Sequence, residues 1–131
     1  GMVGLDTSVF DKDYQGKSPP YNIPGINPFS AFPMFYIKYV RDGDVFNMEE
    51  AVQKTATMAA RVHNMKGRGV LKEGAYADIV LMDLPNLKVL STEIEPRQHP
   101  EGIEYVVVNG TVAVDEGKYT GERAGRVLTR E

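Results

Sequence analysis

The segment "IEYVVVNGTVAVDEG" constrains the fold more than any other part of this 131-residue chain. It consists of two valine-rich runs on either side of Asn109-Gly110, a residue pair that favours the type I′ turn of a two-residue β-hairpin. We therefore predict a tight hairpin at this point. The strand pairs expected from a two-residue loop are Val108 with Thr111, Val107 with Val112, and Tyr105 with Val114.

One face of this expected hairpin is apolar, and we expect it to be buried because successive side chains of a strand point to opposite faces of a sheet. Its members are Ile103, Tyr105, Val107, Val112 and Val114. The run "ADIVLMD" (77–83) is apolar on both faces and predicts a further, buried strand. A short strand is also expected over 126–129. The second half of the chain is thus predicted to be mostly β.

The first half has a different pattern. Residues 2–6, "MVGLD", resemble the tail of a buried strand, and residues 7–31 form a proline-rich stretch that we expect to be a loop packed on other parts of the protein. A helix is predicted to begin at Pro33, because proline is tolerated in the first turn. A second helix is predicted after Asn47, whose side chain can form a capping box with Glu50.

Composition excludes several classes of function. The net charge of −3 and the pI of about 5.4 do not favour a nucleic-acid partner or an anionic membrane. Without cysteine there is no disulfide, thiolate site or thiol nucleophile. No run approaches the roughly 18 apolar residues of a membrane span, and no signal peptide is visible, so we expect a cytoplasmic protein with no membrane partner.

The two histidines do not predict a metal site. His63 and His99 lie far apart in the sequence, and neither belongs to an HxH or HExxH pattern. We expect His63 at a helix C-terminus and His99 in a loop, each with a structural or solvent-exposed role. No metal ligand and no cofactor-binding residue is therefore assigned to this chain.

Three segments carry a resemblance to a known family. "GRGVLKEGAYADIVLMD" matches a G-x-[LI]-x-x-G-x-x-A-D-[LI]-V pattern typical of the amidohydrolase superfamily. "FPMFYIKYVRDGDVFNMEEAVQKTATMAARV" and "HPEGIEYVVVNGTVAVDEGKYTGERAGRVL" resemble the closing segments of its N-acyl-D-amino-acid deacylases, the D-aminoacylase group. The residues matching the first pattern are Gly69, Leu71, Gly74, Ala77, Asp78 and Val80.

The resemblance implies a fold and a division of the chain. Members of this group are longer and combine a (β/α)₈ barrel, which holds zinc, with a small β-sandwich. Residues 2–65 would be the end of the barrel: its last strand, a proline-rich loop and two helices. Residues 66–131 would be the C-terminal part of the sandwich. The expected fold class is α+β, and the implied substrate of the parent enzyme is an N-acyl amino acid.

The same resemblance implies a catalytic residue. "VGLDT" corresponds to a V-G-S-D-G-like sequence, whose aspartate accepts a proton from the metal-bound water and returns it to the leaving amine. Asp6 stands at that position. The neighbours Leu5 and Thr7 depart from the small residues usual there. Asn27-Pro28-Phe29 replaces a frequent His-Pro-Arg, which puts substrate handling in doubt. The alternative for Asp6 is a strand-end aspartate that hydrogen-bonds its own turn.

Three hypotheses follow. The first is the C-terminal portion of a deacylase, catalytically inert by itself because the histidine ligands would lie upstream. The second is a free-standing β-rich packing or oligomerisation module, which would self-associate through its exposed β surface. The third is a portion of a hydantoinase- or dihydroorotase-like amidohydrolase, which shares the pattern around Asp78. Asp78 itself is expected to be structural, accepting backbone N–H groups at a strand entry.

Overall fold

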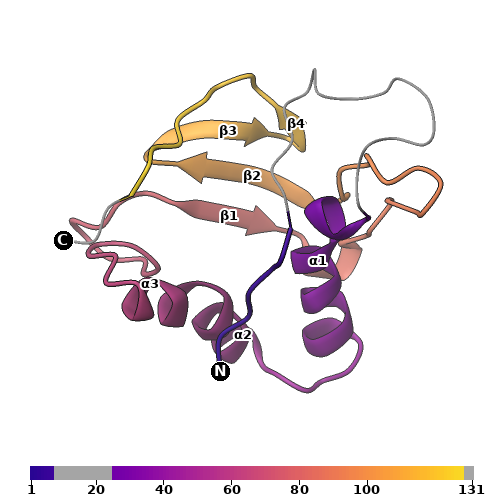
Figure 1. Cartoon of the computed structure of the whole chain (residues 1–131), viewed down its shortest axis with the longest axis horizontal. Coiled ribbons are helices and arrows are strands. Elements are labelled where there is room, and N and C mark those ends of the chain that lie inside the picture. The colour runs from indigo at the N-terminus through magenta and orange to yellow at the C-terminus, as the bar shows by residue number, and fades with distance from the viewer. Residues whose placement is uncertain (8–24, 129–131) are drawn as a thin grey trace.

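The computed structural model describes residues 1–7 and 25–128, and within them two helical segments precede a four-stranded antiparallel sheet (Figure 1). The predicted α+β class is therefore confirmed at this level. Most of the proline-rich stretch, residues 8–24, lies outside the described residues. In Figure 1 the helices lie along the side of the sheet formed by β1 (Ile79–Met82), whereas β4 (Lys118–Tyr119) forms the opposite edge.

The first helical segment begins earlier than predicted. It comprises α1 (Asn27–Tyr36) and a π-helical continuation, η1 (Ile37–Arg41). Pro28, rather than Pro33, occupies the first turn, where a missing backbone N–H costs nothing. The hydroxyl and the backbone N–H of Ser30 both donate to the carbonyl of Ile26, at 2.7 and 3.1 Å, and so stabilise this early start.

The second helical segment begins where the sequence predicts. It comprises α2 (Met48–Val52), the π-helical η2 (Gln53–Thr57) and α3 (Met58–Val62). Asn47 Oδ1 accepts the backbone N–H of Glu50 at 2.9 Å, and Glu50 Oε2 accepts the backbone N–H of Asn47 at 3.1 Å. The predicted capping box is therefore confirmed, and it satisfies two backbone donors that the first turn leaves without helical partners.

The sheet has the strand order β1-β2-β3-β4. At the β2–β3 turn, Asn109 and Gly110 have φ of 48° and 84°, and a type I′ turn requires positive φ at both positions. The predicted hairpin is confirmed, but part of its register is wrong. A bulge makes Val106, and not Tyr105, the partner of Val114. The strands are β1 (Ile79–Met82), β2 (Ile103–Val108), β3 (Thr111–Asp115) and β4 (Lys118–Tyr119).

The expected burial of these strands is also wrong within the described residues. Val112 is 42% exposed, and the other members of the expected apolar face are only partly buried. β1 is an edge strand in which Val80 and Leu81 are 52% and 55% exposed, rather than a strand buried on both faces. The described residues supply a helical layer beside β1 but no second sheet across the hairpin, so valine-rich strands remain accessible to solvent.

Two further expected strands are not observed. Residues 2–6 carry no strand, because the backbone N–H of Val3 donates to the carbonyl of Lys54 in η2 at 3.0 Å instead of entering a ladder. Residues 126–128 also have no strand, and residue 129 lies outside the described part. In their place the two-residue strand β4 extends the sheet beyond β3.

The buried core is small and lies where the two helical segments meet the end of β1. Tyr36, Ala51 and Leu87 form its centre, and Leu87 comes directly after a 3-10 turn, η3 (Leu84–Asn86). The Tyr36 hydroxyl forms a hydrogen bond of 2.8 Å with Thr55 Oγ1, so one helical segment is tied to the other. Partly buried side chains surround this centre: Phe35, Ile37, Val40, Phe46, Met48, Met82, Leu84 and Ile103.

Candidate functional site

Asp6, the residue expected to be catalytic, is exposed in the N-terminal stretch, which has no helix or strand among residues 1–7. Just before Asp6, the backbone of Val3 is anchored by its hydrogen bond to the carbonyl of Lys54. Within residues 1–7 and 25–128, the Asp6 carboxylate has no hydrogen-bond or ion-pair partner. The geometry thus presents an accessible carboxylate three residues after this anchor, without neighbours among the described residues that define a reaction.

The residues that depart from the family pattern lie in two separate segments. Leu5 and Thr7 are exposed beside it. Asn27 and Pro28 belong to the first turn of α1, and the ring of Phe29 makes an edge contact with the ring of His99, with 5.6 Å between their centroids. The triplet expected in a loop therefore forms the start of a helix.

Asp78 has the structural role that the sequence predicts. Its Oδ1 accepts the backbone N–H of Asn109 at 2.8 Å, and its Oδ2 pairs with the guanidinium of Arg68. The same guanidinium donates to Asn109 Oδ1 at 2.6 Å. Burial by itself raises the pKa of Asp78, but the Asn109 N–H and the Arg68 charge outweigh burial and hold that pKa below its ordinary value.

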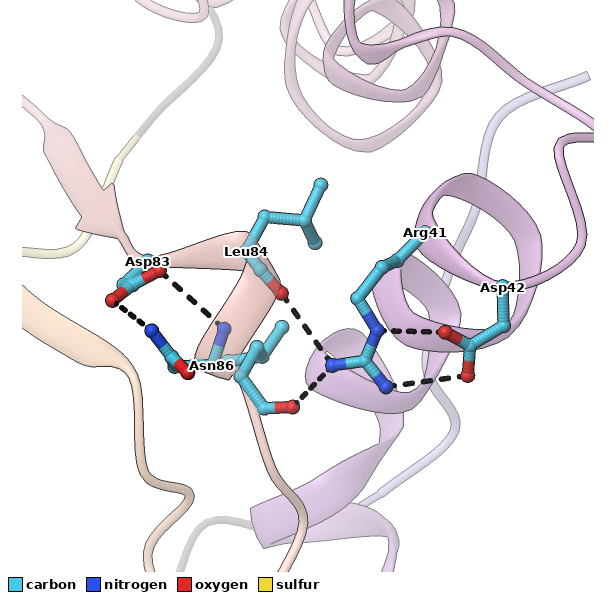
Figure 2. Close-up of polar contacts among 6 residues, drawn as sticks. Arg41, Asp42, Asp83, Leu84 and Asn86 are labelled. Atoms are coloured by element: carbon cyan, nitrogen blue, oxygen red, sulfur yellow. Dashed lines mark hydrogen bonds and ion pairs between the residues drawn. The ribbon is translucent and has the colours of Figure 1, made fainter.

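Arg41 forms a second polar cluster that the sequence did not reveal (Figure 2). Its Nη1 donates to the backbone carbonyls of Leu84 and Leu87, at 3.4 and 2.7 Å, and so connects η1 to the η3 turn. Its other nitrogens contact the carboxylate of Asp42, at 2.7 and 3.2 Å. The hydrogen bonds of this pair lower the pKa of Asp42 and raise the pKa of Arg41.

This cluster is structural. Figure 2 shows that the guanidinium bridges two backbone segments, while Asp83 accepts from Asn86 within the η3 turn itself, at 2.8 Å between side-chain atoms. No sequence signal predicts such a bridge, because its acceptors are main-chain carbonyls more than 40 positions away. The carboxylates of Asp42 and Asp83 both accept hydrogen bonds from nearby residues of their own segments.

The histidines lie where the sequence predicts, and they do not converge. His63 is the C-cap residue of α3, His99 is in the loop before β2, and both are exposed. Across the described ranges, no group of three or more His, Cys, Asp or Glu side chains is arranged to hold a metal ion. These residues therefore do not fit a metal centre of the kind that the resemblance implies for the parent enzyme.

An apolar cavity of about 420 Å³ lies between the helical segments and β1. Its walls include Phe32, Val52, Leu71 and Val80, and the only carboxylate in its lining is that of Asp78. Asp78 is already paired with Arg68, and the hydroxyls of Tyr36 and Thr55 are engaged in hydrogen bonds, so the described lining offers hydrophobic contact but no unengaged acid, base or nucleophile. Within the described residues, no helix has the length and apolar character needed to cross a bilayer.

Comparison with known proteins supports the resemblance. Residues 4–114 match the sequence model of the Amidohydrolase family. A D-aminoacylase of Alcaligenes xylosoxydans xylosoxydans is 36% identical over 102 residues, which are 78% of this chain and 21% of that protein. An N-acyl-D-glutamate deacylase of the same organism is 35% identical over 103 residues, again with 21% of the relative covered. Dihydroorotases match less of the chain, as in Pediococcus pentosaceus with 31% identity over 87 residues.

Solved structures give the same relationship. A crystal structure of D-aminoacylase superposes with a TM-score of 0.71 at 35% identity, covering 76% of this chain and 21% of that one. An N-acyl-D-glutamate deacylase from Bordetella bronchiseptica, complexed with zinc and a phosphonate inhibitor, superposes with a TM-score of 0.58 over 60% of this chain. The chain thus spans about a fifth of the length of these relatives. It belongs to the amidohydrolase family.

Proposed function

We propose that this chain is the C-terminal portion of a metal-dependent amidohydrolase that hydrolyses N-acyl-D-amino acids to a free amino acid and a carboxylate. One observation carries the proposal: a continuous match to a D-aminoacylase, 36% identical over 102 residues, to which a D-aminoacylase crystal structure adds a superposition with a TM-score of 0.71. On this proposal, residues 2–65 close a (β/α)₈ barrel and residues 66–131 contribute to its small β-sandwich.

Asp6 is proposed as the carboxylate that moves a proton during amide hydrolysis. The attacking water must lose a proton and the leaving nitrogen must gain one, and a single carboxylate can do both in turn. The exposure of Asp6, and its lack of a partner among the described residues, support a group that is available for this exchange. In the crystal structure of the Bordetella bronchiseptica relative, zinc is bound.

The chain by itself is proposed to be inactive. The described residues do not fit a metal centre, and the apolar cavity contains no available acid or base. Any metal in the longer enzyme would be held by other residues. We therefore expect no deacylation of N-acetyl-D-amino acids by the purified chain in the presence of zinc, as followed by release of free amine.

A chimera tests the proposed activity directly. This chain replaces the matched segment of the Alcaligenes D-aminoacylase, and the product is assayed with N-acetyl-D-amino acids. We expect the chimera to retain deacylation, and Asp6→Asn to lower its kcat by about 100-fold or more, since general acid–base groups contribute about 10²–10⁴-fold. The substitution keeps the size of the side chain and removes its capacity to accept a proton.

Asp44→Asn is the matched control for this experiment. Asp44 is also exposed, and asparagine tolerates its positive φ of 46°, so the control removes one carboxylate without straining the backbone. Equal kcat values for Asp6→Asn and the unsubstituted chimera would refute the role of Asp6. A chimera that folds and binds metal but hydrolyses no N-acyl-D-amino acid would refute the substrate class.

The dihydroorotase match favours a second candidate function, a cyclic-amide hydrolase. The 31% identity over 87 residues, 64% of this chain, is weaker than the deacylase match but covers much of the same chain. The equivalent chimera in the Pediococcus pentosaceus dihydroorotase distinguishes the two candidates. Ring opening of dihydroorotate there, together with no activity in the deacylase chimera, would favour this second candidate.

The exposed apolar side chains favour a third candidate, a self-associating β-rich module. Leu71, Leu81 and Val80 are 80%, 55% and 52% exposed, which is unusual for an isolated protein in water. Size-exclusion chromatography with light scattering measures self-association directly. A concentration-dependent dimer that Leu81→Lys converts to a monomer would support the module, whereas a monomer at high concentration would exclude it.

A further inference from the structure

A second, polar pocket of about 230 Å³ lies between the loop that follows α3 and the C-terminal stretch 126–128. Three of its lining side chains are cationic: Lys66, Arg68 and Arg126. They come from positions up to 60 residues apart, so the pocket exists only because the chain folds back on itself. Tyr76 lies among them and contributes its ring to the wall.

The charged side chains described in this pocket are all cationic. No Asp or Glu is among the described residues of its lining, although the chain as a whole carries a net charge of −3. Arg68 is paired with Asp78, which lies outside the lining. Among the described residues neither Lys66 nor Arg126 forms an ion pair. Among the described residues, Asp78, whose charge also interacts with that of Arg126, is thus one carboxylate near three cationic groups, which leaves an excess of two positive charges.

The walls of the pocket are held in place by contacts that do not depend on a ligand. The backbone N–H of Tyr76 donates to the carbonyl of Gly67 at 2.8 Å, and Arg68 is fixed by Asp78 and by Asn109 Oδ1. Asn109 Nδ2 in turn donates to the carbonyl of Ala124 at 2.7 Å, which ties down the strand-free stretch just before Arg126. The cations are thus presented by connected segments of backbone.

Two guanidinium groups also converge on one aromatic ring. The guanidinium carbons of Arg68 and Arg126 lie 4.2 and 4.6 Å from the centroid of Tyr76. The ring attracts each cation, but the two cations repel each other. An anion in the pocket beside these two guanidinium groups would relieve this repulsion and gain charge-assisted hydrogen bonds.

We propose that this pocket binds a phosphate dianion, either free inorganic phosphate or the phosphate group of a monoester. Three cationic groups and one carboxylate leave two positive charges to match the two negative charges of the ligand, and the guanidinium geometry suits a tetrahedral oxyanion. Small gaps between mobile lysine side chains would not select such an anion. This pocket has fixed walls, and its volume has room for the four oxygens of phosphate. Asp6 is not among the described lining residues of this pocket, and none of those residues also lines the apolar cavity.

The test is a titration of the full-length ¹⁵N-labelled chain with inorganic phosphate, at constant ionic strength and neutral pH. Saturable shifts are expected for the backbone amides of residues 66, 68, 76 and 126, with a Kd on the order of 1 mM or tighter. Methyl phosphate is titrated in parallel. Tighter binding of the ester would identify a monoester as the natural ligand, and tighter binding of inorganic phosphate would identify the free anion; both results support the site.

Single substitutions separate a site from general attraction of anions. Arg126→Met and Lys66→Met should each weaken phosphate binding by about 10-fold, the loss expected for one charge-assisted hydrogen bond. Lys72→Met removes the same charge from an exposed loop position outside the pocket and should leave the Kd unchanged. Equal weakening by all three substitutions, or shifts that do not saturate, would overturn the proposal. Melting curves without phosphate verify that each variant is folded.

The charge of the ligand provides an independent readout. A phosphate monoester loses its second negative charge near pH 6, so its binding should weaken as the pH falls from 7.5 to about 5. Acetate, a single negative charge, should bind at least 10-fold more weakly at all pH values in this range. Acetate binding as tight as that of phosphate would show that the pocket accepts carboxylates and would overturn the assignment to phosphate.

Discussion

Asp78 accepts the backbone N–H of Asn109 at 2.8 Å and so joins the entry of β1 to the turn between β2 and β3. The same carboxylate pairs with Arg68, which donates to the Asn109 side chain. Three segments that are distant in the sequence are therefore tied together by one carboxylate. This triangle holds the loop after the second helical segment against the hairpin turn.

Removal of this carboxylate should destabilise the chain. Asp78→Ala leaves the Asn109 N–H and the Arg68 guanidinium without their acceptor, and we expect a loss of about 1–3 kcal/mol in the free energy of unfolding. Asp78→Asn retains one oxygen for the N–H and should cost less. Urea unfolding measures both losses, with Glu73→Gln, an exposed carboxylate elsewhere, as the control. Equal stability of Asp78→Ala and the unsubstituted chain would contradict the structural role.

The same carboxylate should make stability depend on pH. Because the pKa of Asp78 is lowered in the folded chain, its contribution is fully present above the unfolded value of about 3.9 and is lost as the pH falls through the lower folded pKa. The stability difference between the unsubstituted chain and Asp78→Asn should therefore shrink below about pH 4. Urea unfolding at several pH values from 6 to 2 tests this, and a constant difference would contradict it.

Gly69 is required at its position by both conformation and space. Its φ is +70°, and an added Cβ would lie 2.8 Å from the Cβ of Ala60 and 3.0 Å from the carbonyl oxygen of Ala56. Gly69→Ala should therefore lower the free energy of unfolding by about 1–3 kcal/mol. Gly125→Ala is the matched control, since nothing lies within 4 Å of its added Cβ. Thermal unfolding of both variants provides the comparison.

The capping box at the start of the second helical segment should contribute measurably. Asn47→Ala removes the acceptor for the Glu50 N–H, and replacement of such a cap costs about 1 kcal/mol. Asn47→Asp keeps a side-chain oxygen at this position and should restore most of the loss. Urea unfolding followed by circular dichroism measures the effect. Identical midpoints for the Ala and Asp variants would show that the observed bonds do not stabilise the helix.

Local signals in the sequence were sufficient for several elements. The Asn109-Gly110 turn and the Asn47–Glu50 capping box were predicted correctly because each depends on residues no more than three positions apart. The structural role of Asp78 was predicted from its place at a strand entry, but its partner Arg68 was not. The family was also evident from the order of three motifs, and comparison with relatives confirmed it.

Non-local features were decided by the tertiary structure. The bulge that pairs Val106 with Val114 lies in the pairing of β2 with β3, and no single-strand pattern specifies it. The apolar runs around Val80 and Val112 correctly predicted strands but not their exposure, because burial depends on which layers cover a sheet.

The sequence by itself determined turn chemistry, helix capping, the α+β class and the family. Only the tertiary structure brought Arg41 to the carbonyls of η3, and Lys66 and Arg126 into one pocket. The reason is physical: turns and caps are formed by neighbours along the chain, whereas pockets and bridges require segments whose approach is fixed by packing as a whole.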